Sequence, residues 1–561
     1  MAKAKKKRAV AQPSEEELLL SRQESLDNKI MVILLIIIAL VPLITRMVVL
    51  PHTAPTISGN ILDTGMKGNA FTYLKMNLLI FLTSAAMLIF LYKMVFHKYR
   101  IKQSFINVPT AVLLVLILLS CLFSSYSSVA TTGIFTRHEG TLTYIMYIVL
   151  FFIAANIQIK PKYLDYLVYA LAPLVLVNSI LGLLGFYGIN ILDNPAIQAI
   201  AISPDYAQYI TEGSLLSTTV NNPNYVSGIA AVIFVIFLTR FLFSNRISET
   251  IIYYILLLFT FSMLLTATST SGFLTLLVVV PFVLVPAFQK ERIIQVILKS
   301  AGLLASLVLI YMKLNSHNQA VYANTMGFYP YMAVIPLIML AVVLLIVIAM
   351  RYKGLGKGIA VMAALLLIAG VLYSDNLQRI PVFNQLGQVV ESFSMPDSDP
   401  ASLIPDETGV LRLPSYVSGL DSGRIHIWTQ TIDLIKEKPL LGYGLDTIGY
   451  YFPHYDLKGA TISSTVVDKP HNMYLSMAFG AGIPALLAFL VLVIYYLKEN
   501  LLLYIENINT HRRVMLLCIL GGCLAYLFQG FVNDSIIGTA PIFWIIFGIG
   551  VSMLGQENIE A

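Results

Sequence analysis

The chain has 561 residues, of which 57% are hydrophobic and 12% charged; its mean hydropathy is +0.79 and its net charge is +6. Soluble domains carry about twice this charged fraction, so the composition excludes a soluble globular protein and predicts an integral membrane protein. We attribute the positive charge to membrane topology and contact with lipid headgroups, and expect no binding of nucleic acid.

Apolar segments of helix length recur along the chain. A span needs about 20 residues, because the hydrocarbon core is ~30 Å thick and a helix rises ~1.5 Å per residue. The sequence therefore predicts an all-α, polytopic fold with about fourteen transmembrane helices. They are placed near residues 30–50, 74–96, 108–124, 141–157, 163–187, 225–243, 251–267, 272–288, 293–312, 329–350, 357–373, 471–497, 514–532 and 536–554.

Lysine and arginine residues define the predicted orientation. With a cytoplasmic N-terminus, every short loop rich in these residues falls inside, as the positive-inside rule requires. The predicted organisation is a cytoplasmic basic segment at 1–29, helices one to eleven within 30–373 and a large extracytoplasmic loop at 374–470. Helices twelve to fourteen follow within 471–554, and a cytoplasmic tail at 555–561. The multi-pass protein is thus expected in the cell membrane with both termini cytoplasmic.

The long loop contains one segment with helical periodicity. Ile425, Trp428, Ile432 and Ile435 recur at steps of three and four residues, which predicts an amphipathic helix over 424–438. This helix is too short and too polar to span, so we expect it on the outer membrane surface with Trp428 at the level of the headgroups.

Arg424 lies in the first turn of this predicted helix. A cation is unfavourable at the positive end of a helix dipole unless an anion accompanies it. A guanidinium matches a phosphate bidentately and stays charged, which favours a phosphate ligand. An ion pair with Asp421 or Asp433 is an equally weighted alternative.

His471 follows Pro470 directly at the start of the next span. It is either an interfacial hydrogen-bonding residue or a general base. The neighbouring Lys469 is expected to favour the neutral imidazole, which is the form that accepts a proton. Asn472 is expected to orient the ring or to bind a sugar hydroxyl.

Other polar residues gather in the outer segments that precede two earlier helices. Arg137 and Glu139 either pair with one another or take part in a site. Asn222 and Asn224 flank Pro223, a pattern typical of a turn and helix cap but also compatible with binding. The histidines and aspartates of the long loop match no compact ligand spacing, so no metal site is predicted. The near absence of ionisable residues in the middle of spans argues against an ion-coupled pump.

These residues together resemble the O-antigen ligase and O-antigen polymerase family of bacterial envelope-glycan assembly. The family pattern has an Arg, a Trp, a Pro-Leu-x-Gly-x-Gly turn, a His-Asn pair and a Gly-rich helix. Here these are Arg424, Trp428, residues 439–444, His471 with Asn472, and residues 480–484. The resemblance extends to Arg137-His138-Glu139-Gly140 and Asn222-Pro223-Asn224. One departure is the turn at 269–272, which reads Ser-Thr-Ser-Gly where many members carry Arg; Arg137 is the candidate replacement.

The resemblance implies a membrane glycosyltransferase that uses a polyprenyl-diphosphate-linked glycan at the extracytoplasmic face, without metal or cofactor. It assigns Arg424 and Arg137 to the diphosphate and His471 to the base. The predicted substrate-binding residues also include Glu139, Asn222, Asn224, Trp428, Lys469 and Asn472. The acceptor, a lipid, glycan or protein, stays open, and with it the choice between ligase and repeat-unit polymerase. A lipid-linked oligosaccharide flippase and a non-catalytic scaffold are the alternatives from other classes.

Overall fold

The computed structural model describes residues 14–52, 65–202, 218–220, 222–269, 271–288, 292–317, 424–453, 467–506 and 510–555. Among these residues, seven helices are long and apolar enough to cross a membrane, and four shorter helices are apolar as well. The chain is therefore a helical membrane protein. The spans predicted at 329–350 and 357–373 lie outside the described residues, so the count of fourteen stays a prediction.

The described elements follow one another from α1 to α23. In the first half they are α1 (Glu15–Leu40), β1 (Val48–His52), β2 (Gly65–Asn69), α2 (Tyr73–Phe96), α3 (Asn107–Leu122), α4 (Ser127–Thr132), α5 (Thr141–Asn156), α6 (Pro161–Tyr169), α7 (Ala172–Phe186), η1 (Ile191–Asp193) and α8 (Pro195–Ala201). They continue with α9 (Pro223–Phe243), α10 (Ile247–Thr266), α11 (Ser271–Ala287), α12 (Ile293–His317), α19 (Arg424–Glu437), η4 (Ile448–Tyr450), α20 (Met473–Ala481), α21 (Ile483–Glu506), α22 (Thr510–Gln529) and α23 (Ala540–Leu554).

Three predicted spans differ from the helices observed. The first helix runs from Glu15 to Leu40 instead of 30–50, because a Ser14 capping box starts it and Pro42 follows its end. Residues 48–52 form β1, which pairs antiparallel with β2. The span at 163–187 is two helices, α6 and α7, and the span at 471–497 is divided into α20 and α21 at Gly482.

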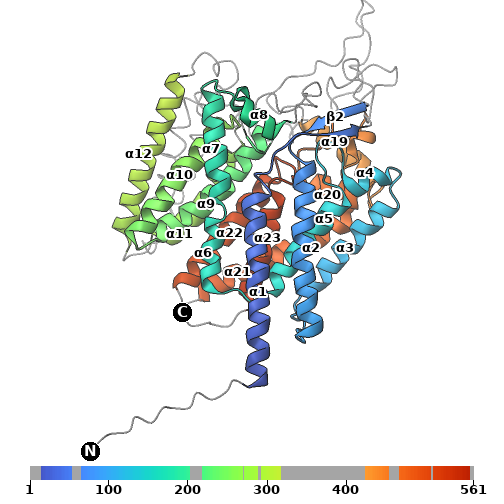
Figure 1. The fold of residues 1–561 in the computed structure, drawn as a ribbon, viewed down its shortest axis with the longest axis horizontal. Helices are drawn as coiled ribbons and strands as arrows, with labels where there is room; N and C mark the ends of the chain where they lie inside the picture. Colours follow the sequence, from blue (N-terminus) through green and yellow to red (C-terminus); the bar gives the residue numbers. More distant parts are fainter. Residues whose placement is uncertain are drawn as a thin grey trace, which may run out of the picture.

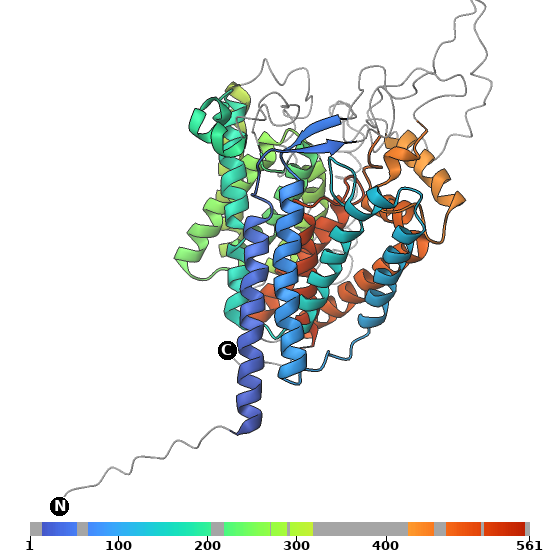
Figure 2. The same ribbon diagram turned by 45° about the vertical axis from the view of Figure 1, so that its right-hand side comes forward.

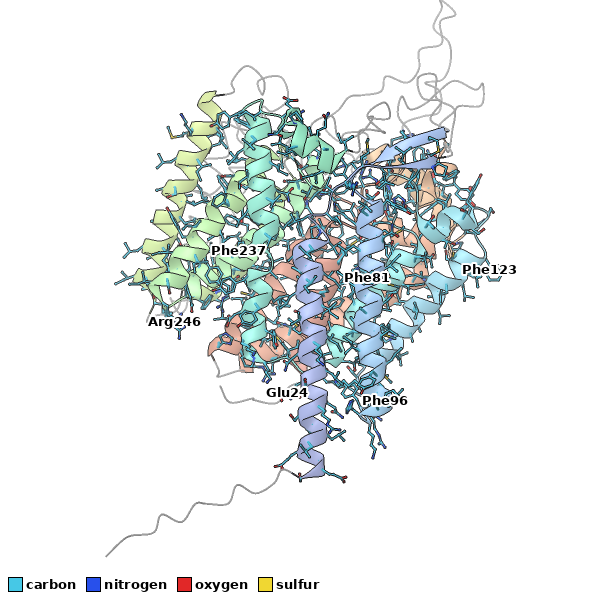
Figure 3. All side chains as sticks on the ribbon, viewed as in Figure 1. Glu24, Phe81, Phe96, Phe123, Phe237 and Arg246 are labelled. Carbon is cyan, nitrogen blue, oxygen red and sulfur yellow. The ribbon has the colours of Figure 1, made fainter. Side chains whose placement is uncertain are left out.

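The helices form one bundle (Figure 1). Helix α9 lies in its interior, packed against α10, α11 and α22, and almost all of its residues are buried. On the outside, Phe81, Phe96 and Phe123 are 69%, 68% and 71% exposed, whereas Phe237 of α9 is fully buried (Figure 3). An exterior of large apolar side chains suits contact with lipid.

The loops rich in Lys and Arg lie at one end of this bundle. The turns after α2, α5 and α9 and the first turn of α22 contain basic residues used for the orientation, and the N-terminal end of α1 lies at the same end (Figures 1 and 2). At the other end lie β1, β2 and α19, together with the N-terminal ends of α2, α5, α9, α20 and α23. Helix N-termini carry partial positive charge, so this second end favours anions.

Candidate functional site

Helix α19 begins at Arg424 and ends at Glu437, close to the range predicted from its periodicity. One face of this helix packs against the rest of the protein, with Thr431 fully buried and Ile435 7% exposed. Ile432, which belongs to the predicted apolar stripe, is 41% exposed. The indole Nε1 of Trp428 donates a hydrogen bond to the carbonyl of Pro470, at 2.8 Å. Trp428 thus connects α19 to the segment that carries His471.

The Gly-containing turn after α19 holds this helix against α20. Its Tyr443 and Gly444 amides donate to the carbonyls of Phe479 and Gly480, both at 2.9 Å. Gly442 and Gly482 have φ angles of 66° and 86°, and a Cβ on either would lie within 2.3 Å of a backbone oxygen. The glycines of this family pattern are therefore needed for close backbone contact.

The loop at 133–140 is organised around the buried carboxylate of Asp446. Its Oδ2 accepts hydrogen bonds from the amides of Ile134, at 2.8 Å, and Glu139, at 3.2 Å. Its Oδ1 lies 3.1 Å from the ammonium of Lys469, which is also 3.4 Å from Glu139 Oε2. Two acids from distant parts of the chain thus share one cation.

Burial dominates the electrostatics of this triad. It raises the pKa of both Glu139 and Asp446, because a buried carboxylate loses hydration when charged. Burial alone would lower the pKa of Lys469, but the two acids outweigh it and hold that pKa well above its usual value. Glu139 and Lys469, both predicted to bind substrate, are placed here inside the protein as a link between loops.

Arg137 is held by Asp468 and Tyr225. Its Nε lies 3.0 Å from Asp468 Oδ2, and its guanidinium lies 5.5 Å from the centre of the Tyr225 ring. The suggested pairing of Arg137 with Glu139 is therefore wrong. Arg137 pairs with Asp468, and Glu139 pairs with the next residue, Lys469. Burial would raise the pKa of Asp468, but the Arg137 charge and hydrogen bond outweigh it, so that pKa is lowered.

His471 forms a hydrogen-bonded pair with Asp534. Its Nδ1 lies 3.1 Å from Asp534 Oδ2; the His471 side chain is 34% exposed and that of Asp534 fully buried. Burial would raise the pKa of Asp534, but the hydrogen bond from His471 and the charges of Lys469 and Arg137 outweigh it and lower that pKa. An ionised carboxylate only accepts hydrogen bonds, so Nδ1 carries a proton; in the neutral imidazole, Nε2 is then the atom that can accept one.

The asparagines near the site cap the N-termini of helices or connect neighbouring segments. Asn472 caps α20 by accepting from the amides of Tyr474 and Leu475, both at 3.0 Å. Asn222 caps α9, which confirms the turn-and-cap interpretation at that position. Asn224 Oδ1 accepts from Ser269 Oγ at 2.6 Å, and its carbonyl from Asn533 Nδ2 at 3.0 Å. The turn that lacks the family arginine therefore lies directly beside Asn224.

These contacts join most of the predicted residues into one polar network. Tyr225 connects its two halves, because its ring lies under Arg137 and its hydroxyl is 3.4 Å from Asp534 Oδ2. Arg424 lies one helical turn before Trp428, about 6 Å along the axis and on the same face. Sequence reasoning missed Asp534 and Tyr225. A signal existed for Asp534, since Asn533-Asp534-Ser535 is a polar triplet between two apolar runs.

Backbone strain also concentrates at this network. His138, Asp446 and His471 have φ angles of 53°, 63° and 53°. Non-glycine residues rarely adopt this left-handed conformation, and where they do they often belong to functional sites. A cavity of about 600 Å³ lies at the other end of the bundle, which is the end with the basic loops. Its lining residues include Lys102, Asn107 and Glu499. It contains none of the predicted site residues.

The fold and this network define a multi-span membrane protein with a buried, hydrogen-bonded polar centre at the helix ends opposite its basic loops. Residues 329–490 match the family model described as O-antigen ligase, so the chain carries that domain and the predicted resemblance is confirmed. The match includes α19, the Gly-containing turn, His471 and α20. It supports a membrane glycosyltransferase of the O-antigen ligase and polymerase type. No curated protein matches the chain.

Proposed function

We propose that this protein transfers a glycan from a polyprenyl-diphosphate carrier to an acceptor hydroxyl at the extracytoplasmic face of the membrane. The observation that carries the proposal is the His471–Asp534 pair beside Arg137, at the helix ends where the O-antigen ligase domain contributes α19 and α20. The end opposite the basic loops is extracytoplasmic under the positive-inside rule. There the donor must already be activated on its lipid.

His471 is the proposed general base. Its Nε2 takes the proton of the acceptor hydroxyl as that oxygen attacks the anomeric carbon of the donor. Asp534 holds the ring in the tautomer that leaves Nε2 free, and its negative charge stabilises the imidazolium that forms. The ring has access to substrate because His471 is partly exposed, whereas Asp534 is shielded from water.

Arg137 and Arg424 are the proposed partners of the leaving group. The new glycosidic bond forms on one face of the anomeric carbon while the bond to the diphosphate oxygen breaks on the other, so the configuration inverts. The negative charge that stays on the diphosphate needs preorganised cations. A guanidinium has five N–H donors, and Asp468 takes those of Nε and Nη2, so Nη1 keeps donors for phosphate oxygens.

The test is a transfer reaction with purified protein, a polyprenyl-diphosphate-linked oligosaccharide and a hydroxyl acceptor. We expect release of polyprenyl diphosphate by the wild type, and a loss of at least ~10²-fold in His471→Ala, in line with removal of a general base. His426→Ala is the matched control, because His426 is an exposed histidine on α19. Full activity of His471→Ala would reject the assignment of the base.

The same reaction distinguishes this function from the alternative functions. A flippase would move the donor across a vesicle membrane without releasing polyprenyl diphosphate, and a scaffold would do neither. A polymerase would transfer the growing glycan onto another lipid-linked repeat unit, whereas a ligase would transfer it onto a different acceptor. Supplying the two acceptors separately therefore identifies which reaction the protein performs.

A further inference from the structure

Lys75 is a buried lysine in the first turn of α2, at the same end of the bundle as His471. It is 1% exposed, and its ammonium donates to the carbonyls of Ile44, at 2.6 Å, and Thr219, at 3.0 Å. Among the residues that the structure describes, no acid forms an ion pair with it. A buried ammonium without a counter-charge is costly, and two carbonyls occupy only two of its three N–H groups.

The surroundings of Lys75 are fixed relative to Arg137. Thr219, which accepts one of the Lys75 bonds, is held by Asn178, whose Oδ1 accepts from the Thr219 amide at 2.7 Å. On the other side, Thr72 Oγ1 and His138 Nδ1 are 2.8 Å apart, which docks the start of α2 on the loop that contains Arg137. Both cations are therefore positioned before any ligand arrives.

Lys75 and Arg137 line the same small pocket. Tyr225, Thr219 and Gly538 complete much of its wall, and its volume is about 20 Å³. A space of this size holds one water-sized group. It is too small for a whole phosphate but large enough for a single phosphate oxygen. Two cations on one atom-sized space select an anionic oxygen over a neutral one.

We propose that this pocket receives one oxygen of the diphosphate of the lipid-linked donor, with Lys75 beneath that oxygen and Arg137 beside it. The inference rests on the proposed function, which supplies the diphosphate. It adds Lys75 as a third cation at the leaving-group site, beside Arg137 and Arg424, from a part of the chain outside the matched domain. Lys75 thereby gains a counter-charge that none of the described residues provides.

The test measures equilibrium binding of a polyprenyl diphosphate to the full-length protein in lipid nanodiscs. We expect Lys75→Met to weaken binding at least ~10-fold, in the range for loss of one charge-assisted contact. Lys299→Met is the matched control, since Lys299 also donates to backbone carbonyls, of Phe241 and Ser244, but at the basic end. Its affinity should change less than about twofold. Equal affinities of Lys75→Met and wild type would overturn the proposal.

Gly538→Ala gives a second test that keeps both cations. A Cβ there would lie 3.6–3.8 Å from its nearest neighbours, which is ordinary contact, so the variant should fold and fill the pocket. We expect weaker diphosphate binding with an unchanged unfolding temperature. Unchanged binding would mean that the pocket holds only water and would refute the proposal. Wild-type protein that binds the diphosphate but transfers no glycan would contradict the proposed function and leave the Lys75 site supported.

Discussion

The substitution Asp534→Asn separates a positioning role from a structural one. It keeps the shape of the side chain but removes the negative charge that faces the imidazolium formed when His471 takes a proton. Two charges about 4 Å apart interact by about 4 kcal/mol at an effective dielectric of 20. At ~1.4 kcal/mol per factor of ten, kcat should fall by about 10³. The donor KM should stay nearly constant, because Asp534 is buried beneath the ring.

The assay is steady-state release of polyprenyl diphosphate, with thermal unfolding as the check on folding. Ser476→Ala is the matched control, because Ser476 Oγ donates to Asp534 Oδ1 at 2.9 Å and does not touch the oxygen that faces His471. Asp534→Glu should recover part of the lost rate. The reasoning is refuted if Asp534→Asn keeps more than about half of the wild-type kcat, or if Ser476→Ala loses as much.

Three further outcomes are expected. Lys469→Met should cost about 3–5 kcal/mol of stability, since it leaves Glu139 and Asp446 buried without a cation. Burial raises the pKa of both acids, so their protonated forms are favoured in the folded state, and this variant should unfold more easily as pH rises from about 4 to 8; a pH-independent loss would contradict this. Gly482→Ala should lower the unfolding temperature, because its Cβ would lie 2.2 Å from the Leu440 carbonyl oxygen. The control is Gly188→Ala, where φ is +76° but the surrounding space is open, so the loss should be only about 1 kcal/mol. Equal shifts of the two variants in a thermal unfolding assay would count against the close-contact argument. Transfer should continue in EDTA, because side-chain cations are proposed to neutralise the leaving group; a rate lost in EDTA and restored by Mg²⁺ would show otherwise.

Local patterns in the sequence predicted the helices and the position of α19. Hydropathy located most spans within a few residues, and a three- to four-residue period located α19, because both properties depend on neighbouring residues. The breaks at Pro42 and Gly482 lie inside apolar runs, where hydropathy does not change.

The pairing of charges was not predictable in the same way. Arg137 and Glu139 are two residues apart, yet they bind Asp468 and Lys469, about 330 residues further along. Which acid meets which cation depends on how the loops at 133–140 and 467–472 approach each other, and no local pattern encodes that approach. No local pattern indicated a role for Lys75, because its hydrogen-bond partners come from the segment after α1 and the segment before α9.

The burial of the acidic side chains explains how an anionic donor can approach a site that contains four acids. The side chains of Glu139, Asp446 and Asp534 are fully buried, and only Asp468 reaches 21% exposure. Of the groups proposed to meet substrate, His471 is 34% exposed and Arg137 is 12% exposed, so Arg137 is less exposed than the Asp468 that it binds. The three fully buried acids, Glu139, Asp446 and Asp534, thus lie beneath the groups proposed to meet substrate, and Asp468 lies beside them. A diphosphate at the surface then competes directly with Asp468 alone for Arg137, and the converging helix N-termini add to its attraction.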